Sequence, residues 1–350
     1  MRQLNNKAFK PNELKQTNMK KIITGIFALS TMFSFAQIDL ESILEGGTGD
    51  AQTLLQGYVG PFPTGFGNGI NGGWYTTAKS HKLFGIDIAV IANAAFVPET
   101  AETFTFNNAD YTNIKLDDTS ISSAEIPTIF GSQKLDDRPL LAFSDTSGNS
   151  ISTSALPGSG LKEAIGYNVM PSAMIQAGVG LFKNTDLKIR FVPKQTGDEY
   201  EFSTFGIGIM HDLKQWIPFV KRLPFDVSAL VAWNDVKSKF YMDSQNEPTQ
   251  ALEFNTKTFM FQILASKKLS IFTLYGGIGT TSYETDVNML GTYTTSQDKT
   301  YTDPIKLNYE GSSMRANLGL SMKLLFINIA AEYALQEYNV FSVRAGFSIR

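Results

Sequence analysis

The chain has 350 residues, and its 30 Lys and Arg against 33 Asp and Glu give a formal net charge of −3 at pH 7. This near balance excludes the basic footprint of a nucleic-acid-binding protein, so no nucleic-acid partner is expected. The sequence contains no cysteine, which excludes disulfides, thiolate chemistry and an acylated cysteine anchor.

The first recognisable element is a secretory signal peptide at residues 19–36. Lys20 and Lys21 precede an apolar stretch of about 14 residues, and small residues end the segment MKKIITGIFALSTMFSFA. Because a membrane-spanning helix needs roughly 20 residues, we expect cleavage after Ala36 and export rather than anchoring. Residues 1–18 lack any such pattern, and we interpret them as an artefact of an upstream start site.

Residues 37–73 show no alternation of polar and apolar side chains. Helical spacing is predicted over 37–56, and the following stretch GYVGPFPTGFGNGINGGW, rich in glycine and proline, is predicted to be irregular. Gly67, Gly69 and Gly72 match a dinucleotide-binding motif in form. Prolines rather than a strand precede them, so nucleotide binding is not expected. We predict that residues 37–73 fold into the interior of the structure that follows, as a hatch.

From residue 74 to residue 350 the dominant period is two. About eleven alternating segments occur, many of them about ten residues long, the length that a tilted strand needs to cross a bilayer. Short connections alternate with long polar ones, of which residues 107–166 are the longest. The pattern predicts an all-β fold, an antiparallel transmembrane β-barrel of about 12 strands within a range of about 10 to 14.

The predicted barrel has both termini in the periplasm and an even number of strands. One further strand is therefore sought in GGWYTTAKSHK or ADYTNIKL. Residues 107–166 then form a long outer loop, and the predicted periplasmic connections are 183–185, 212–224, 268–270 and 323–325.

Alternation sorts the side chains of each predicted strand into two faces. A charge that faces lipid at the middle of the bilayer costs about 2–4 kcal/mol, so the charged face must point into the barrel. The candidates for the lumen are Asp186, Lys188, Arg190, Asp226, Arg315, Glu332, Arg344, Met174 and Met260. Since this face also carries apolar residues, two explanations stay open. Either side chains and a plug fill the lumen, or the lumen offers an apolar path to a hydrophobic solute.

One predicted periplasmic connection carries apolar residues at helical spacing, from Leu213 to Leu223. We predict an interfacial helix here. Trp216 and Phe219 suit the boundary between lipid and water, while Lys221 and Arg222 reach the headgroups as interfacial anchors. The alternative is a helix packed on the sheet of a soluble protein.

Candidate catalytic and metal-binding residues are scarce. The chain has 2 histidines, which excludes a metal site built on several of them. His81 follows Ser80 and His211 precedes Asp212, but neither pair makes a credible nucleophile with its base, and both are interpreted as solvated turn histidines. No enzyme activity, metal or cofactor is therefore expected.

Three features resemble an uncharacterised family of Gram-negative outer-membrane β-barrels: the signal peptide, the stretches GNGINGGWYTTAKSHKLFG and GIMHDLKQWIPFVKRLPFDVS, and the aromatic C-terminal strand. The resemblance covers most of residues 37–350. More distantly, a segment before a barrel resembles the long-chain fatty-acid transporter family, which implies uptake of hydrophobic compounds through a hatch-plugged barrel. This chain lacks that family's Asn-Pro-Ala hatch motif, and its clear strand count is smaller.

Together these features predict a monomeric barrel in the outer membrane of a Gram-negative bacterium. Its expected role is passage or uptake of a small hydrophobic molecule. The alternative is a structural or surface-interaction protein that displays residues 107–166 and transports nothing. The expected partners are outer-membrane lipid and the barrel-insertion machinery, which would recognise the C-terminal strand YNVFSVRAGFSIR.

The mature protein is expected to begin at Gln37, because small residues at 34 and 36 follow a lysine-led apolar stretch. N-terminal sequencing of the protein from the membrane fraction checks this. A mature chain that still contains residues before Ile22 would contradict it.

Overall fold

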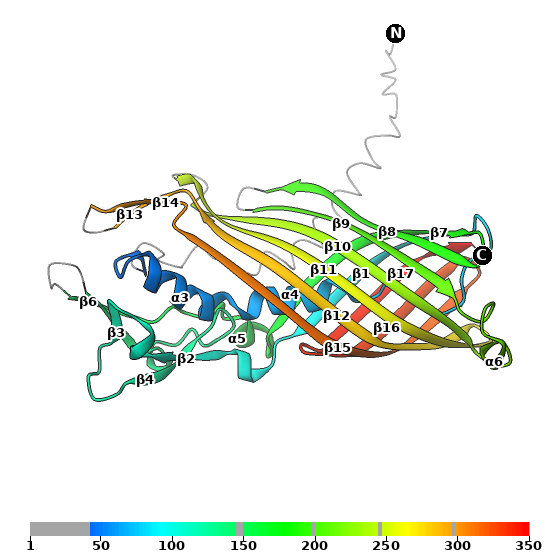
Figure 1. The fold of residues 1–350 in the computed structure, drawn as a ribbon, viewed down its shortest axis with the longest axis horizontal. Helices are drawn as coiled ribbons and strands as arrows, with labels where there is room; N and C mark the ends of the chain where they lie inside the picture. Colours follow the sequence, from blue (N-terminus) through cyan, green and yellow to red (C-terminus); the bar gives the residue numbers. More distant parts are fainter. Residues whose placement is uncertain (1–42, 145–149, 198–199, 244–246, 296–297, 350) are drawn as a thin grey trace, which may run out of the picture. The chain divides into compact units, whose positions relative to one another are not determined.

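The computed structural model describes residues 43–144, 150–197, 200–243, 247–295 and 298–349 (Figure 1). The predicted start-site artefact and signal peptide, residues 1–36, lie outside the described residues. None of the described helices is long and apolar enough to cross a membrane.

Ten antiparallel strands close into a barrel, which β1 and β17 complete by pairing Ile86 with Ile349 and Ala95 with Val340. The predicted all-β antiparallel barrel is therefore confirmed, with a strand number at the lower limit of the expected range. In spatial order the strands are β1 (Ile86–Phe96), β17 (Val340–Ile349), β16 (Ile327–Leu335), β15 (Ile305–Leu324), β12 (Phe272–Leu290), β11 (Glu247–Leu269), β10 (Asp226–Asp243), β9 (Tyr200–Asp212), β8 (Thr185–Thr196) and β7 (Val169–Leu181).

Neither stretch in which a further strand was sought belongs to the barrel wall. GGWYTTAKSHK lies inside the barrel, and ADYTNIKL contributes β3 (Ile114–Leu116) to a separate three-stranded sheet with β5 (Leu140–Ser144) and β6 (Ser150–Ser154). Period two reports that a strand has two different faces, but it does not report which strand pairs with it.

The connection between β1 and β7 holds small elements outside the barrel wall. Beside the sheet of β3, β5 and β6, β2 (Thr103–Asn107) pairs with β4 (Ser123–Pro127). The remaining elements of this connection are η2 (Glu99–Ala101), η3 (Asn108–Asp110), η4 (Leu135–Asp137) and α5 (Leu161–Ile165). A hairpin of β13 (Thr292–Thr294) and β14 (Thr300–Thr302) joins β12 to β15.

The two ends of the barrel differ in the length of their connections. Residues 182–184, 213–225, 270–271 and 325–326 join strands at the end where β1 begins and β17 ends. At the other end β8 and β9, β10 and β11, and β16 and β17 are joined by short connections, but this end also has the two longest connections, 97–168 and 291–304. Barrels of the outer membrane have short periplasmic turns and long extracellular loops. The first end is therefore the periplasmic end, and the second is the outer end.

The interfacial helix predicted from Leu213 to Leu223 is reduced to the single turn of α6 (Pro218–Lys221). Proline cannot donate a main-chain hydrogen bond, so it begins this helix instead of lying within a longer one. Leu213 continues the strand ladder, because its N–H donates to the carbonyl of Val227 at 3.0 Å.

Strand alternation gives the wall an apolar outer face. On β1, Ile86, Ile88 and Val90 are exposed, while Asp87 and Ala89 between them are buried. The same alternation continues around the barrel. Towards the outer end, the outward positions of the longest strands become charged, as at Lys257, Glu284, Lys306 and Glu310. Because β11 has 23 residues and about ten suffice to cross a bilayer, these strands extend beyond the membrane.

Between residue 43 and the barrel, the chain contains the helices α3 (Thr48–Val59) and α4 (Pro61–Ile70). The stretch predicted to be irregular is thus helical over α4. Its prolines stand in the first turn, where a missing N–H costs nothing, and Gly67 leaves room for the ring of Tyr283, which would lie 2.6 Å from an added Cβ. The interior segment also continues to residue 82, past the boundary expected at 73.

Replacing Leu320 with Arg is expected to destabilise the barrel by about 2–4 kcal/mol, because this outward side chain of β15 lies in the apolar band. Asn308→Arg is the matched control. Asn308 is exposed on the same face of the same strand, about 40 Å nearer the outer end. Folding yield and heat-dependent gel mobility measure the effect, and equal losses in both variants would contradict the assignment of the lipid face.

Candidate functional site: plug and lumen

Residues 43–82 are here called the plug. They run from the outer end to the periplasmic end, enclosed by the barrel strands and the outer connection (Figure 1). Near the outer end, the Asp50 carboxylate accepts main-chain N–H bonds from Thr112 and Ile114, each at 3.0 Å. The phenol of Tyr58 donates to the carbonyl of Pro157 at 2.8 Å. The start of the plug is therefore tied to the long outer connection.

The polar end of α4 contacts three wall strands at once. The buried Asn71 donates to the hydroxyl of Thr281 at 2.6 Å, and its carbonyl oxygen accepts from Asn234 and Thr258, both at 3.0 Å. These partners come from β12, β10 and β11. One amide thus fixes the plug against a third of the wall's strands.

Arg190 lies where α4 ends. Its guanidinium donates to the carbonyl of Ile70 at 2.6 Å and to the carbonyl of Gly72 at 2.7 Å, and a third bond reaches the Gln176 amide at 3.0 Å. The guanidinium also stacks on Trp74, 3.7 Å from the ring centre. The last carbonyls of a helix lack partners within the helix and carry partial negative charge, so a cation here satisfies both needs.

Two further arginines hold the middle of the lumen. Arg315 pairs with Glu332 at 2.8 Å. Arg344 pairs with Asp87 and donates to the carbonyl of Gly73 at 3.2 Å. Arg190 and Arg344 thus bind consecutive main-chain carbonyls just after α4.

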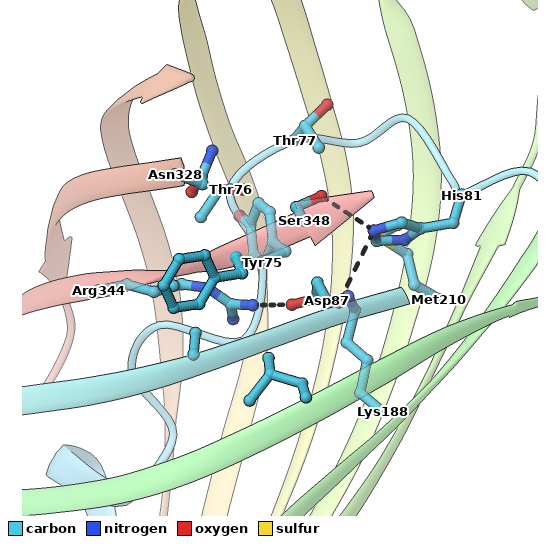
Figure 2. Close-up of a pocket in the computed structure, with 14 residues that line it drawn as sticks. Tyr75, Thr76, Thr77, His81, Asp87, Lys188, Met210, Asn328, Arg344 and Ser348 are labelled. Atoms are coloured by element: carbon cyan, nitrogen blue, oxygen red, sulfur yellow. Dashed lines mark hydrogen bonds and ion pairs between the residues drawn. The ribbon is translucent and has the colours of Figure 1, made fainter. Parts of the chain in front are cut away.

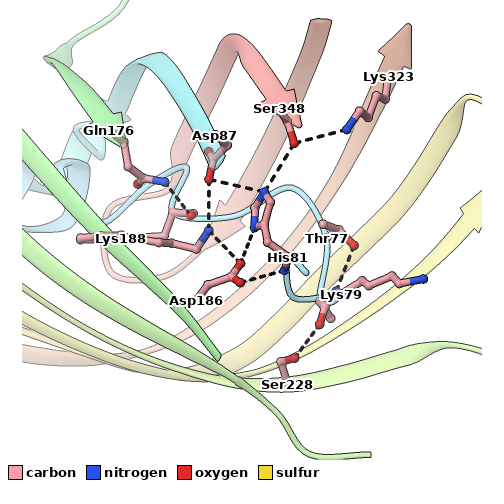
Figure 3. Close-up of polar contacts among 12 residues, drawn as sticks. Thr77, Lys79, His81, Asp87, Gln176, Asp186, Lys188, Ser228, Lys323 and Ser348 are labelled. Carbon is pink, nitrogen blue, oxygen red and sulfur yellow. Dashed lines mark hydrogen bonds and ion pairs between the residues drawn. The ribbon is translucent and has the colours of Figure 1, made fainter. Parts of the chain in front are cut away.

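The periplasmic end of the plug is closed by a charged cluster around His81 (Figure 3). The main-chain N–H of His81 donates to the Asp186 carboxylate at 2.8 Å, and its ring Nδ1 lies 2.8 Å from the other oxygen of that group. Lys188 lies 3.6 Å from Asp186 and 3.9 Å from Asp87. His81, which the sequence analysis interpreted as a solvated turn histidine, is only 3% exposed. The correction follows from its partner, since Asp186 is distant in sequence.

In space, His81 lies between Asp186 and Ser348, as the base of a catalytic triad lies between its orienting acid and its nucleophile. The Ser348 hydroxyl lies 3.4 Å from Nε2, and the ammonium of Lys323 also reaches it at 3.3 Å. Asp87 lies 3.8 Å from the same Nε2. These contacts tie the periplasmic end of the plug to β1, β8 and β17.

A small cavity of about 20 Å³ lies beside this cluster, lined by Tyr75, His81, Lys188 and Arg344 among others (Figure 2). This volume holds about one water molecule. Among the described residues, no group of three or more His, Cys, Asp or Glu side chains could hold a metal ion.

The apolar side chains that point inward pack on the plug. Trp74, Tyr75 and Ala78 of the plug form one buried cluster with Met210, Leu230, Met260, Leu264 and Tyr275 of the wall. The sequence left open whether side chains and a plug fill the lumen or whether the lumen offers an apolar path. In the structure, side chains and the plug fill the lumen.

Eight of the nine residues predicted to face the lumen are buried on the inner side: Met174, Asp186, Lys188, Arg190, Met260, Arg315, Glu332 and Arg344. Asp226 is half-buried at the periplasmic end of β10, apart from the charged cluster. Sequence reasoning missed Trp74, which it assigned to the wall, and the amides of Gln176 and Asn234. Gln176 shares the parity of Met174 on β7, and Asn234 shares the parity of Asp226 on β10, which was the available signal.

Replacing Arg190 with Gln is expected to loosen the plug, because two buried main-chain carbonyls lose their donors. Leaving each carbonyl without a partner costs about 1–3 kcal/mol. An Ala78→Cys reporter, buried in the plug, measures this in a chain without other cysteines. Its labelling by a soluble maleimide should speed up roughly 5- to 150-fold. The control is Lys194→Gln on the same strand, which removes an exposed pair with Glu201. Equal rates in both variants would show that Arg190 does not hold the plug.

Solved structures similar to this chain include Ail, the attachment invasion locus protein of Yersinia pestis, at 10% identity over 76% of this chain and 99% of that one, with a TM-score of 0.26. A Pseudomonas aeruginosa FadL homologue shows 8% identity over 75% and 90%, with a TM-score of 0.25. The translocator domain of autotransporter NalP from Neisseria meningitidis shows 10% identity over 77% and 90%, with a TM-score of 0.24. No curated protein matches the sequence. Residues 19–349 match one family over nearly the whole chain, and the protein thus belongs to the Family of unknown function (DUF6588).

Proposed function

We propose that this outer-membrane barrel passes a small hydrophobic molecule, and that the plug must move for passage to occur. The observation that carries the proposal is the way the plug is held. Wall arginines bind its main-chain carbonyls at Ile70, Gly72 and Gly73. Each such bond is worth a net of only about 0.5–1.5 kcal/mol, or somewhat more with a charged donor, because water can replace it.

The inner wall carries polar side chains that water could hydrate if the plug moved away from them. Thr204, Asn234 and Gln262 point inward and are buried, and each has an oxygen without a hydrogen-bond partner among the described protein atoms. Buried polar atoms of this kind are costly in a permanent core. Water could satisfy them in an open lumen, which supports a plug that is displaced rather than a fixed one.

An aromatic cluster near the outer end supports a hydrophobic solute. Phe62 and Phe66 of α4 pack on wall aromatics, with ring centres 4.7 Å apart for Phe62 and Phe254 and 6.5 Å apart for Phe66 and Phe202. Phe240 joins the cluster at 5.9 Å from Phe254. If α4 moved, these wall rings would face the outer opening, where an apolar molecule could take the place of the plug rings.

The alternative is a structural or surface-interaction protein without transport. The filled lumen favours it, as do the separate small sheets of the outer connection. The two functions differ in one respect that can be measured, since only the first requires the plug to move.

Locking the plug to the wall is expected to abolish passage. A Cβ added at Gly69 of α4 would lie 3.5 Å from the Cβ of Ala95 in β1, so Gly69→Cys with Ala95→Cys should form a disulfide in a chain that has no other cysteine. Proteoliposomes would be assayed with an aromatic hydrocarbon and a fatty acid. The reduced form should transport one of them, and oxidation should stop it.

The matched control is Thr294→Cys with Thr300→Cys, which face each other across the outer hairpin with hydroxyls 3.4 Å apart and do not involve the plug. Oxidation of this pair should leave passage unchanged. Equal passage through the oxidised and reduced plug lock would overturn the gating role. Absence of passage in the reduced and native proteins would favour the structural alternative.

A further inference from the structure

All the chain segments that meet at the periplasmic end expose a large apolar side chain at their tips. Leu325 is 88% exposed, Phe219 75%, Phe84 72%, Phe182 72% and Leu269 56%. They belong to three of the periplasmic connections, to the last residue of β11 and to the residues that enter β1. Turns that project into water are normally polar, so this repetition needs a physical reason.

At two of these tips the backbone conformation is one that a large side chain rarely adopts. Leu325 has a φ of 53° and Phe84 a φ of 60°, both in the left-handed region. Glycine or asparagine adopts this conformation with the least strain. Folding of the barrel gains little from an exposed leucine or phenylalanine at such a position, so the reason must lie in what surrounds the tips.

Four of these five segments also carry exposed basic side chains near the apolar tip: Lys82, Lys183, Lys221, Arg222 and Lys268. The acidic residues nearby are Asp212 and Asp226, which are half-buried, and Asp87 and Asp186, which are buried inside the barrel. In a chain of net charge −3, the periplasmic end is thus the basic end. Lys183 also lies over the ring of Trp216, with its ammonium 5.9 Å from the ring centre.

We propose that these tips and their basic neighbours, here called the periplasmic ring, form a binding belt for anionic phospholipid. The apolar tips enter the boundary between headgroups and acyl chains, and the ammonium and guanidinium groups bind the lipid phosphates. The belt is continuous with the lipid-facing band, since Ile86, Phe272 and Ile349 next to the tips are exposed on the outer face. This continuity selects lipid over a soluble partner, and the charge selects an anionic headgroup.

Quenching of tryptophan fluorescence by brominated lipid tests the proposal on the full mature chain in vesicles. The chain has 3 tryptophans, of which Trp74 is buried, so a Trp233→Phe background leaves Trp216 as the exposed reporter. Brominated phosphatidylglycerol should quench Trp216 at least about threefold more strongly than brominated phosphatidylcholine at the same mole fraction. The preference should weaken as salt is raised.

The combined variant Lys183→Gln, Lys221→Gln, Arg222→Gln and Lys268→Gln should remove the preference and keep the quenching by phosphatidylcholine. The matched control replaces Lys237, Lys239, Lys257 and Lys306 near the outer end with Gln and should keep the preference. Heat-dependent gel mobility verifies that each variant folds.

Equal quenching by the two lipids in the native ring would overturn the proposal, as would a preference that survives in the ring variant or disappears in the control. A Trp216 that neither lipid quenches would place the ring in water, as a surface for a soluble periplasmic partner, and would also overturn the proposal.

Discussion

A segment enclosed in a barrel must find a hydrogen-bond partner for each of its main-chain groups, because little water reaches it. At the end of α4 this requirement falls on Arg190. Its guanidinium is buried completely, and its hydrogen bonds in the described structure go to carbonyl oxygens of Ile70, Gly72 and Gln176. Trp74 covers its face. The path of the plug through the lumen depends on this side chain, since it fixes the point where helix changes to extended chain.

The lipid outside explains why such charges are available inside. Charged side chains on a tilted strand are excluded from the lipid face, so alternation collects them on the inner one. The plug makes use of both kinds of inward residue: its carbonyls meet Arg190 and Arg344, and its aromatic rings meet Met210 and Met260. A proposed gate built this way combines polar contacts that water can replace with apolar contacts that a hydrophobic solute can replace.

The plug also connects the two ends of the molecule. Asp50 and Tyr58 bind the outer connection, and His81 binds Asp186 just before the chain enters β1. A displacement of α4 would therefore shift the outer elements that contact the plug, while His81 stays bound to the wall. In the proposed function, this places the mobile part of the plug at the side from which a solute arrives. The periplasmic ring, held in lipid headgroups, would keep the opposite end in place.

The sequence alone determined the barrel class, the two faces of its strands and the inward position of residues such as Lys188 and Arg315. These properties follow from period two and from the cost of charge in lipid, which act within each strand. Tertiary structure decided the strand number, the helix α4, the course of residues 74–82 and the burial of His81. Each of these depends on a partner distant in the chain. Trp74 and Tyr75 have the composition of a strand, but Arg190 and Tyr275 hold them in the lumen, and no local pattern specifies that pairing.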